Sequence, residues 1–117
     1  MLLAVLGGCA TPEDVPPPKQ LLPKEKLVSL LVQLHLLEAR VEASRLSPDS
    51  ARAIFQQKKS EILWKNDVSE KDSVLQHSFR YYAVNKKDMD EIYKSVIDSL
   101  ERREAQMSGG VKKPAHP

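Results

Sequence analysis

A leucine-rich stretch from Lys24 to Arg45 constrains the fold more than any other part of the sequence. Its apolar residues recur at steps of three and four, the spacing that places side chains on one face of an α-helix. They form two adjacent rows covering more than half of the circumference, wider than the stripe of an ordinary surface helix. Such a helix has to be covered on two sides, so we expect it to be the centre of a helical bundle. The two rows are Leu27, Leu30, Leu31, Leu34, Leu37 and Val41, and Val28, Val32, Leu36, Ala39 and Ala43.

A membrane-spanning helix is the competing interpretation of this stretch, and the sequence argues against it. The apolar run has roughly half of the ~20 residues that a bilayer requires. Ser29, Gln33 and His35 also interrupt it. We therefore interpret it as the core helix of a small domain.

Two further helices are expected directly after the central one, which we expect to end near Leu46. Ser47 followed by Pro48 is typical of a helix start, because Ser accepts a hydrogen bond from the first turn and Pro fits its first position. This second helix should run to about residue 65. Ser69, with Asp72 three residues later, predicts the start of a third helix through a capping box. Its inner stripe would consist of Val74, Leu75, Ser78, Phe79 and Tyr82.

A fourth helix is expected over about residues 86–106. Asn85 and Asp88 repeat the capping pattern, and the apolar residues that follow keep the helical period throughout. Strand-like alternation of useful length is absent from the sequence, so we predict an all-α fold. It would be a small three- to four-helix bundle over residues 24–107, organised around the Leu-rich first helix. The stripe of the fourth helix is Met89, Ile92, Tyr93, Val96, Ile97 and Leu100.

Composition narrows the classes of partner. The chain has 117 residues, which predicts one domain, and a formal net charge of +2. Basic and acidic residues are interspersed, whereas nucleic-acid binders usually gather Lys and Arg on one face. We therefore expect no nucleic-acid partner. With one cysteine and three histidines, the chain has little material for metal chemistry, and we expect no metal and no cofactor.

The cysteine matters through its position. Residues 1–9 read MLLAVLGGC, and the Leu-Gly-Gly before Cys9 resembles the lipobox of bacterial lipoproteins. Small residues there allow a peptidase to close on extended backbone, and cleavage would leave Cys9 as a lipid-bearing N-terminus. The apolar region at residues 2–6 is shorter than the ~7–15 residues of ordinary signals, so either translation starts upstream of Met1 or the signal is short. The alternative is an apolar N-terminus with a buried cysteine.

Residues 10–23 follow as a linker with five prolines, which we expect to be a semi-rigid, extended spacer. Behind a lipidated Cys9, such a spacer would hold the domain away from the membrane. Ala10 after Cys9, rather than Asp, favours the outer membrane under the lipoprotein sorting rule. Residues 108–117 have no apolar periodicity, so we expect a disordered tail.

Several short motifs within residues 23–101 resemble one known family. They include the Leu-His-Leu-x-Glu-Ala of the central helix and the Val-Ser-Glu-x-Asp before the third helix. Their residues are Leu34, His35, Leu36, Glu38 and Ala39; Val68, Ser69, Glu70 and Asp72; Ser78, Phe79, Tyr81 and Tyr82; and Ile92, Tyr93, Val96, Ile97 and Leu100. The pattern resembles the small lipoproteins of Bacteroides-type bacteria grouped as the domain of unknown function DUF4296. The resemblance implies a helical lipoprotein domain without an established activity, and it assigns no functional residues.

One pair of residues has the spacing of a metal site. His35 and Glu38 lie one helical turn apart. Dimetal bundles use two Glu-x-x-His pairs with further glutamates, whereas this pair is single and reversed, and His77 stands in no comparable motif. We therefore expect a half-buried His35 that is hydrogen-bonded to a neighbouring helix. Nucleophile and phosphate-binding motifs are also absent, so we expect no catalytic residues.

Two sets of residues are candidates for an interaction surface. Val28, Val32 and Leu36 are the part of the central helix that three short neighbours would leave uncovered, and a partner or a second copy would bury it. Arg80 and Tyr81 are of the types favoured at interfaces, as is Trp64 near the end of the second helix. The structural alternatives are a Trp64 that covers the bundle end and aromatic packing where the last two helices meet, by Phe79, Tyr82 and Tyr93.

These features predict a lipid-anchored, non-enzymatic interaction module. It would be an accessory subunit that binds a larger envelope protein at the outer membrane, facing the periplasm or the cell surface. The alternative is a binder of a small envelope ligand, such as lipid or a peptidoglycan fragment, in a pocket lined by Leu36, Phe79 and Tyr82. A third hypothesis, an enzyme, would need His35 and Glu38 together in an accessible cleft.

Overall fold

A computed structural model of the chain describes residues 16–107. This part contains the helices α2 (Lys24–Ala43), α3 (Pro48–Lys65), α4 (Val74–Ala83) and α5 (Lys86–Met107), and no strand. The prediction of an all-α bundle is therefore confirmed. The expected lipid site at Cys9, the first part of the linker and the tail at residues 108–117 lie outside the described residues.

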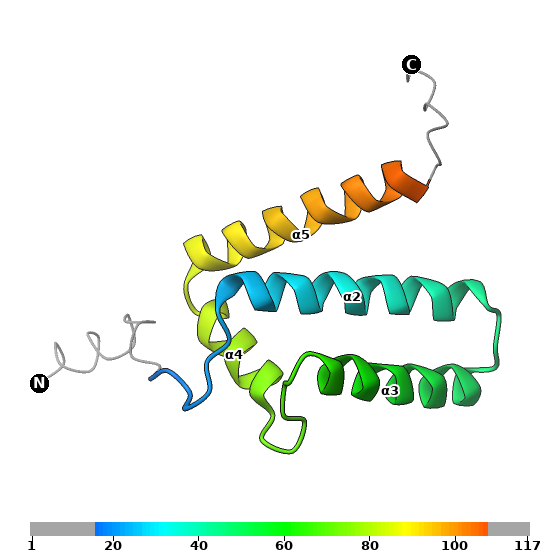
Figure 1. Cartoon of the computed structure of the whole chain (residues 1–117), viewed down its shortest axis with the longest axis horizontal. Coiled ribbons are helices and arrows are strands. Elements are labelled where there is room, and N and C mark those ends of the chain that lie inside the picture. Colours follow the sequence, from blue (N-terminus) through cyan, green and yellow to red (C-terminus); the bar gives the residue numbers. More distant parts are fainter. Residues whose placement is uncertain (1–15, 108–117) are drawn as a thin grey trace, which may run out of the picture.

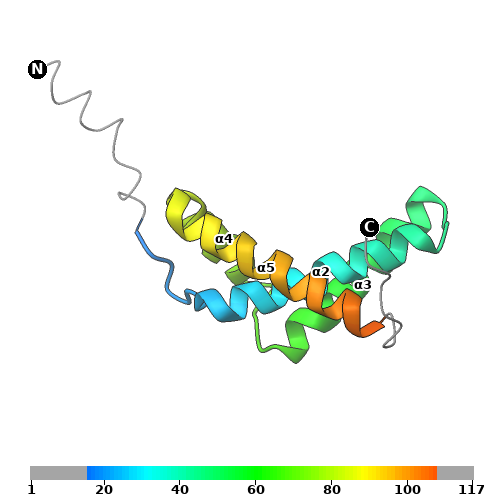
Figure 2. The same cartoon turned by 90° about the horizontal axis from the view of Figure 1, so that it is seen from above.

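Helix α2 is the middle element of the bundle. It contacts α3 on one side and α5 on the other, and the short α4 lies across the end at which α2 begins (Figure 1). Seen from above, α5 crosses over α2 at an angle rather than running along it (Figure 2). Since α2 has neighbours on two sides, its two rows of apolar residues fulfil the role that the sequence predicted for them.

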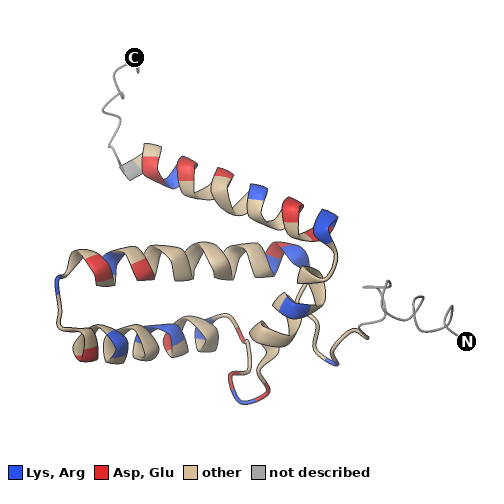
Figure 3. Cartoon of the chain, turned by 180° about the vertical axis from the view of Figure 1, so that it is seen from behind, with Lys and Arg blue, Asp and Glu red and all other residues tan. Residues whose placement is uncertain are grey.

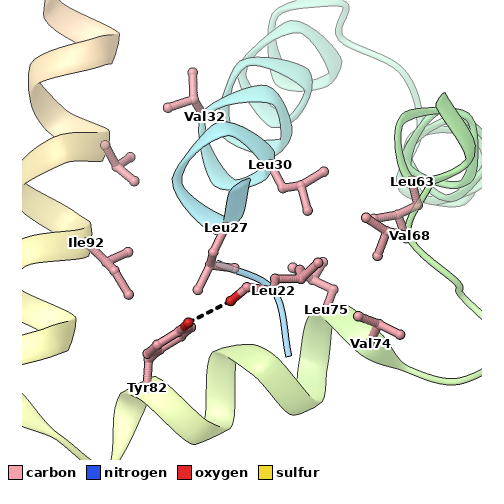
Figure 4. Packing of buried hydrophobic residues seen from close by; sticks show 11 residues of the cluster. Leu22, Leu27, Leu30, Val32, Leu63, Val68, Val74, Leu75, Tyr82 and Ile92 are labelled. Atoms are coloured by element: carbon pink, nitrogen blue, oxygen red, sulfur yellow. Dashed lines mark hydrogen bonds between the residues drawn. The ribbon is translucent and has the colours of Figure 1, made fainter. Parts of the chain in front are cut away.

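The core collects where α2 meets α4 and the first half of α5. Leu27 and Leu30 are fully buried there, and the close-up in Figure 4 shows them between the helices. No charged residue interrupts α2 from Leu27 to Leu37, whereas acidic and basic residues alternate along α3 and α5 (Figure 3). The remaining buried cluster is formed by Leu22, Val32, Leu63, Val68, Val74, Leu75, Tyr82, Ile92 and Val96.

Two of the predicted helix starts are confirmed. The Ser47 hydroxyl accepts a hydrogen bond from the Ser50 amide at 3.3 Å, and Pro48 occupies the first position of α3. The Asn85 side-chain oxygen accepts from the Asp88 amide at 3.2 Å at the start of α5. Both caps satisfy backbone donors that the first turn of a helix cannot use itself.

The expected start of the third helix is wrong. The Ser69 hydroxyl does accept from the Asp72 amide at 3.1 Å, but the turn that it caps ends at once. Ser73 takes a left-handed conformation with φ 52°, which cannot continue a right-handed helix, so α4 begins only at Val74. In the same way Arg45, with φ 55°, follows the end of α2, which stops at Ala43 rather than near Leu46.

Two isoleucines of α5 test this description of the core. Ile92 is 1% exposed and Ile97 is 53% exposed. Ile92→Ala should lower the free energy of unfolding by about 2–5 kcal/mol, because it leaves a cavity. Ile97→Ala should change it by about 0.5 kcal/mol or less, as is usual for surface positions. Urea unfolding followed by circular dichroism measures both, and equal losses would contradict the arrangement of α5 on α2.

Candidate functional site

The end of the linker is bound by two side chains of α4. The Leu22 amide donates a hydrogen bond to the Ser78 hydroxyl at 2.9 Å, and the Tyr82 hydroxyl donates to the Leu22 carbonyl at 2.6 Å. Ser78 and Tyr82 are four residues apart on α4 and therefore project from the same face. Figure 4 shows the bond from Tyr82 to Leu22. We call these three residues the linker clamp.

The linker clamp contributes to stability because its residues are buried. Leu22, Ser78 and Tyr82 are all buried, and a buried backbone group that lacks a partner costs about 1–3 kcal/mol. The clamp satisfies both backbone groups of Leu22, the last residue before Pro23 and α2. Burial also raises the pKa of the Tyr82 hydroxyl. The chain that precedes the domain is therefore attached to it at a defined point.

A charged contact reinforces this end of the bundle. The Lys24 ammonium lies 2.5 Å from Asp88 Oδ1 and 3.1 Å from Glu91 Oε1, which joins the start of α2 to the start of α5. Hydrogen bonds to Asp88 and then to Glu91 raise the pKa of Lys24. The two carboxylates also lie in the first turns of α5, where the helix dipole favours negative charge.

The predicted surface of the central helix is wrong for one of its three residues. Val32 is 2% exposed and belongs to the core, because α5 covers it. Val28 and Leu36 are half-buried and pack against the same core. These residues therefore do not form the uncovered apolar face expected from the sequence.

The other three predicted surface residues differ in exposure. Trp64 is 79% exposed and Arg80 is exposed, whereas Tyr81 is half-buried with its ring edge-on to Tyr82 at 5.5 Å between centroids. Trp64 therefore does not cover the end of the bundle. The hydroxyl of Tyr82 lies inside the linker clamp.

Two residues that sequence reasoning placed in the core are at the surface. Tyr93 is 37% exposed and Ile97 is 53% exposed, one turn apart on α5. The Tyr93 ring packs edge-on against Phe79 of α4 at 6.4 Å between centroids, which confirms the predicted aromatic contact between the last two helices. We call Tyr93 and Ile97 of α5, together with Phe79 of α4 that contacts Tyr93, the α5 row. The available signal was the width of the α5 stripe, which exceeds what one neighbouring helix can cover.

The expected metal-type pair is at the surface. His35 Nδ1 lies 3.8 Å from Glu38 Oε1, and both side chains are largely exposed. The His35 side chain is 45% exposed, close to the half-buried position expected, but among the described residues no hydrogen bond joins it to another helix. Within residues 16–107, no group of three or more His, Cys, Asp and Glu side chains could hold a metal ion.

Of the residues expected to line a ligand pocket, none lines the grooves described between residues 16 and 107. Tyr82 is buried in the core, and Leu36 and Phe79 are half-buried. An open groove of about 510 Å³ does lie between α2 and α5. Its lining includes Val28 and Val32 on α2, and Ser99, Arg102, Arg103 and Gln106 on α5.

The comparisons with known proteins bear on the whole domain. The model of a family described as "Domain of unknown function (DUF4296)" matches residues 18–106, which include α2 to α4, all of α5 except Met107, and the linker clamp. Comparisons with curated proteins and with solved structures found no significant match. Among the described residues, no helix has the length and apolarity that crossing a bilayer demands.

The linker clamp is tested by removing each hydroxyl. Tyr82→Phe and Ser78→Ala should each lower the free energy of unfolding by about 1–3 kcal/mol, because each leaves a buried group of Leu22 unpaired. The double variant should lose less than the sum, since both act on one residue. The matched control is Tyr93→Phe, which keeps the ring contact with Phe79. Hydrogen exchange of the Leu22 amide and urea unfolding measure the effect, and a Tyr82→Phe result equal to the control would refute the clamp.

The raised pKa of Tyr82 predicts how stability depends on pH. The folded state keeps the hydroxyl proton at a pH where the unfolded chain, with the ordinary value of 10.0, has lost it. Stability is therefore unaffected below pH 10.0 and falls as pH rises through the higher pKa of the folded state. The pKa of Lys24 is also raised from its ordinary value of 10.5, so Lys24 likewise lowers the stability as pH rises above that value. Measured by urea unfolding, the free energy of unfolding should fall less steeply with rising pH for Tyr82→Phe than for the wild type.

Proposed function

The chain belongs to the DUF4296 family, and we propose that it is a lipid-anchored, non-enzymatic accessory subunit of a bacterial envelope complex. The observation that carries the proposal is the linker clamp. A chain segment that serves only as a frayed terminus gains nothing from two buried hydrogen bonds to the domain. A segment that joins the domain to a membrane anchor does gain from these bonds, because the point of attachment determines which part of the domain lies near the membrane.

The anchor would be lipid on Cys9. Cys9 precedes Leu22 by 13 residues, a stretch that reaches at most about 45 Å when fully extended. The domain would therefore stay within that distance of the membrane surface. With Ala10 next to Cys9, the destination we propose is the outer membrane, with the domain facing the periplasm or the cell surface.

The surface for the protein partner would be the α5 row with the neighbouring Arg80. Phe79, Tyr93 and Ile97 offer aromatic and aliphatic contacts, and Arg80 adds a planar charged group. Aromatic residues and arginine are the types enriched at the energetic centre of protein interfaces. Two of its residues, Tyr93 and Ile97, lie on α5, which α3 does not contact closely, and this leaves space for a partner (Figure 1).

Labelling of cells with radioactive palmitate tests the anchor. The full-length protein should carry the label and sediment with membranes, whereas Cys9→Ser should lose the label and enter the soluble fraction. The reason is that the thiol of Cys9 is the only one in the chain that can be acylated. Absence of label from the wild type would remove the anchored part of the proposal.

The same membranes test the partner surface. After cross-linking, one envelope protein should be recovered with the wild type and lost with Ile97→Asp, since a charge within the α5 row would have to be desolvated. Gln57→Asp places the same charge on an exposed position of α3 and should leave recovery unchanged. Equal recovery with both variants would refute the α5 row as the binding surface.

A further inference from the structure

Trp64 is the most exposed large apolar side chain of the described part. It is 79% exposed, compared with 53% for Ile97 and 43% for Leu46, and it is the only tryptophan in the chain. Tryptophan is highly buried on average in soluble proteins. An indole held this far out, in the last turn of a well-formed helix, calls for an environment that the monomer in water does not supply.

The surroundings of Trp64 form a shallow apolar depression. A groove of about 460 Å³ beside the indole is lined by Leu63, Trp64 and Val68, with Ser60 and Lys71 among its polar edges. Val68 is fixed there by its amide, which donates to the Leu63 carbonyl at 2.9 Å. Leu63 and Val68 are themselves almost fully buried, so Trp64 supplies most of the exposed apolar surface here.

The loop after α3 leads from this depression to a groove that the linker borders. A second groove is lined by Pro18, Lys19 and Gln20 of the linker and by Asp72, Val74 and His77. Lys71 borders the first groove and Asp72, the next residue, borders the second. The segment from Val68 to Asp72 thus connects Trp64 to the point from which the chain continues toward Cys9.

The charges around Trp64 are balanced. Glu61 pairs with Lys58 at 3.6 Å, and Glu70 accepts a hydrogen bond from the Ser60 hydroxyl at 3.0 Å. Lys65 and Lys71 offset the acidic side chains nearby. A surface without net charge does not favour a strongly charged partner. It suits a zwitterionic lipid headgroup region, where tryptophan is enriched because its ring is apolar and its N–H is polar.

We propose that Trp64 and its groove face the membrane that holds the anchor, with the indole at the boundary between headgroups and acyl chains. The occupant of this surface is a zwitterionic phospholipid bilayer. The inference rests on the proposed function for the tether at Cys9. One indole binds a bilayer weakly by itself, but attachment within about 45 Å keeps its local concentration at the membrane high. Trp64 then sets the orientation of the domain.

The test couples the full chain through its only cysteine, Cys9, to a maleimide headgroup lipid in phosphatidylcholine vesicles. Since Trp64 is the only tryptophan, intrinsic fluorescence reports on it alone. On coupling, its emission should shift to shorter wavelength, and lipids brominated near the headgroup should quench it, at low and high salt alike. The same chain with a capped thiol should show neither change when mixed with the vesicles.

The matched control moves the reporter to the other side of the bundle. Trp64→Phe combined with Ile97→Trp places the indole on α5, where coupling should cause neither shift nor quenching; far-UV circular dichroism verifies that the variant is folded. Equal quenching of both reporters, or none at Trp64, would overturn the orientation. A shift that grows with protein concentration without vesicles would overturn it in favour of a second copy. Because maleimide replaces the natural lipid, these results are independent of palmitate labelling in cells.

Discussion

Two hydrogen bonds to one backbone residue connect the parts of this domain. Helix α4 has ten residues, a length at which an isolated helix is marginal in water. Its position depends on what it packs against, and the clamp on Leu22 attaches it to the residue just before α2. Because α5 follows α4 after a short connection and also binds Lys24 through Asp88 and Glu91, the start of α2 determines where the last two helices lie. Leu22 also belongs to the same buried cluster as Leu63 of α3, so it takes part in the core as well as in the clamp.

Features of the fold that depend on local chemistry were predictable from the sequence. The period of the apolar residues located α2 and α5, and Ser47 with Pro48 located the start of α3, since each signal acts within one or two turns. The start of α4 was not predictable, because serine does not by itself favour the left-handed conformation that Ser73 adopts. The partner of Tyr82 was not predictable either: Leu22 is 60 residues away, and spacing cannot report contacts at that distance.

The exposed apolar surface was expected on the wrong helix, for a reason that applies to other small bundles. The width of an apolar stripe has to be compared with the number of neighbours that cover it. Helix α2 has the wider stripe but is packed by α3, α4 and α5, so Val32 is buried. Helix α5 packs chiefly on α2 and touches α4 at one end, and the surplus of its narrower stripe, Tyr93 and Ile97, reaches solvent.

The two exposed apolar surfaces, at Trp64 and at the α5 row, lie on different sides of the domain. Trp64 belongs to the end of α3, from which the following loop leads to the groove bordered by the linker, whereas Tyr93 and Ile97 belong to α5 on the other side of α2 (Figure 1). A tether alone would leave the domain free to rotate, and either face could then turn toward the bilayer. A second contact at Trp64 would remove that freedom, because two attachment points fix the orientation of the domain. The α5 row would then face away from the membrane, accessible to a protein partner.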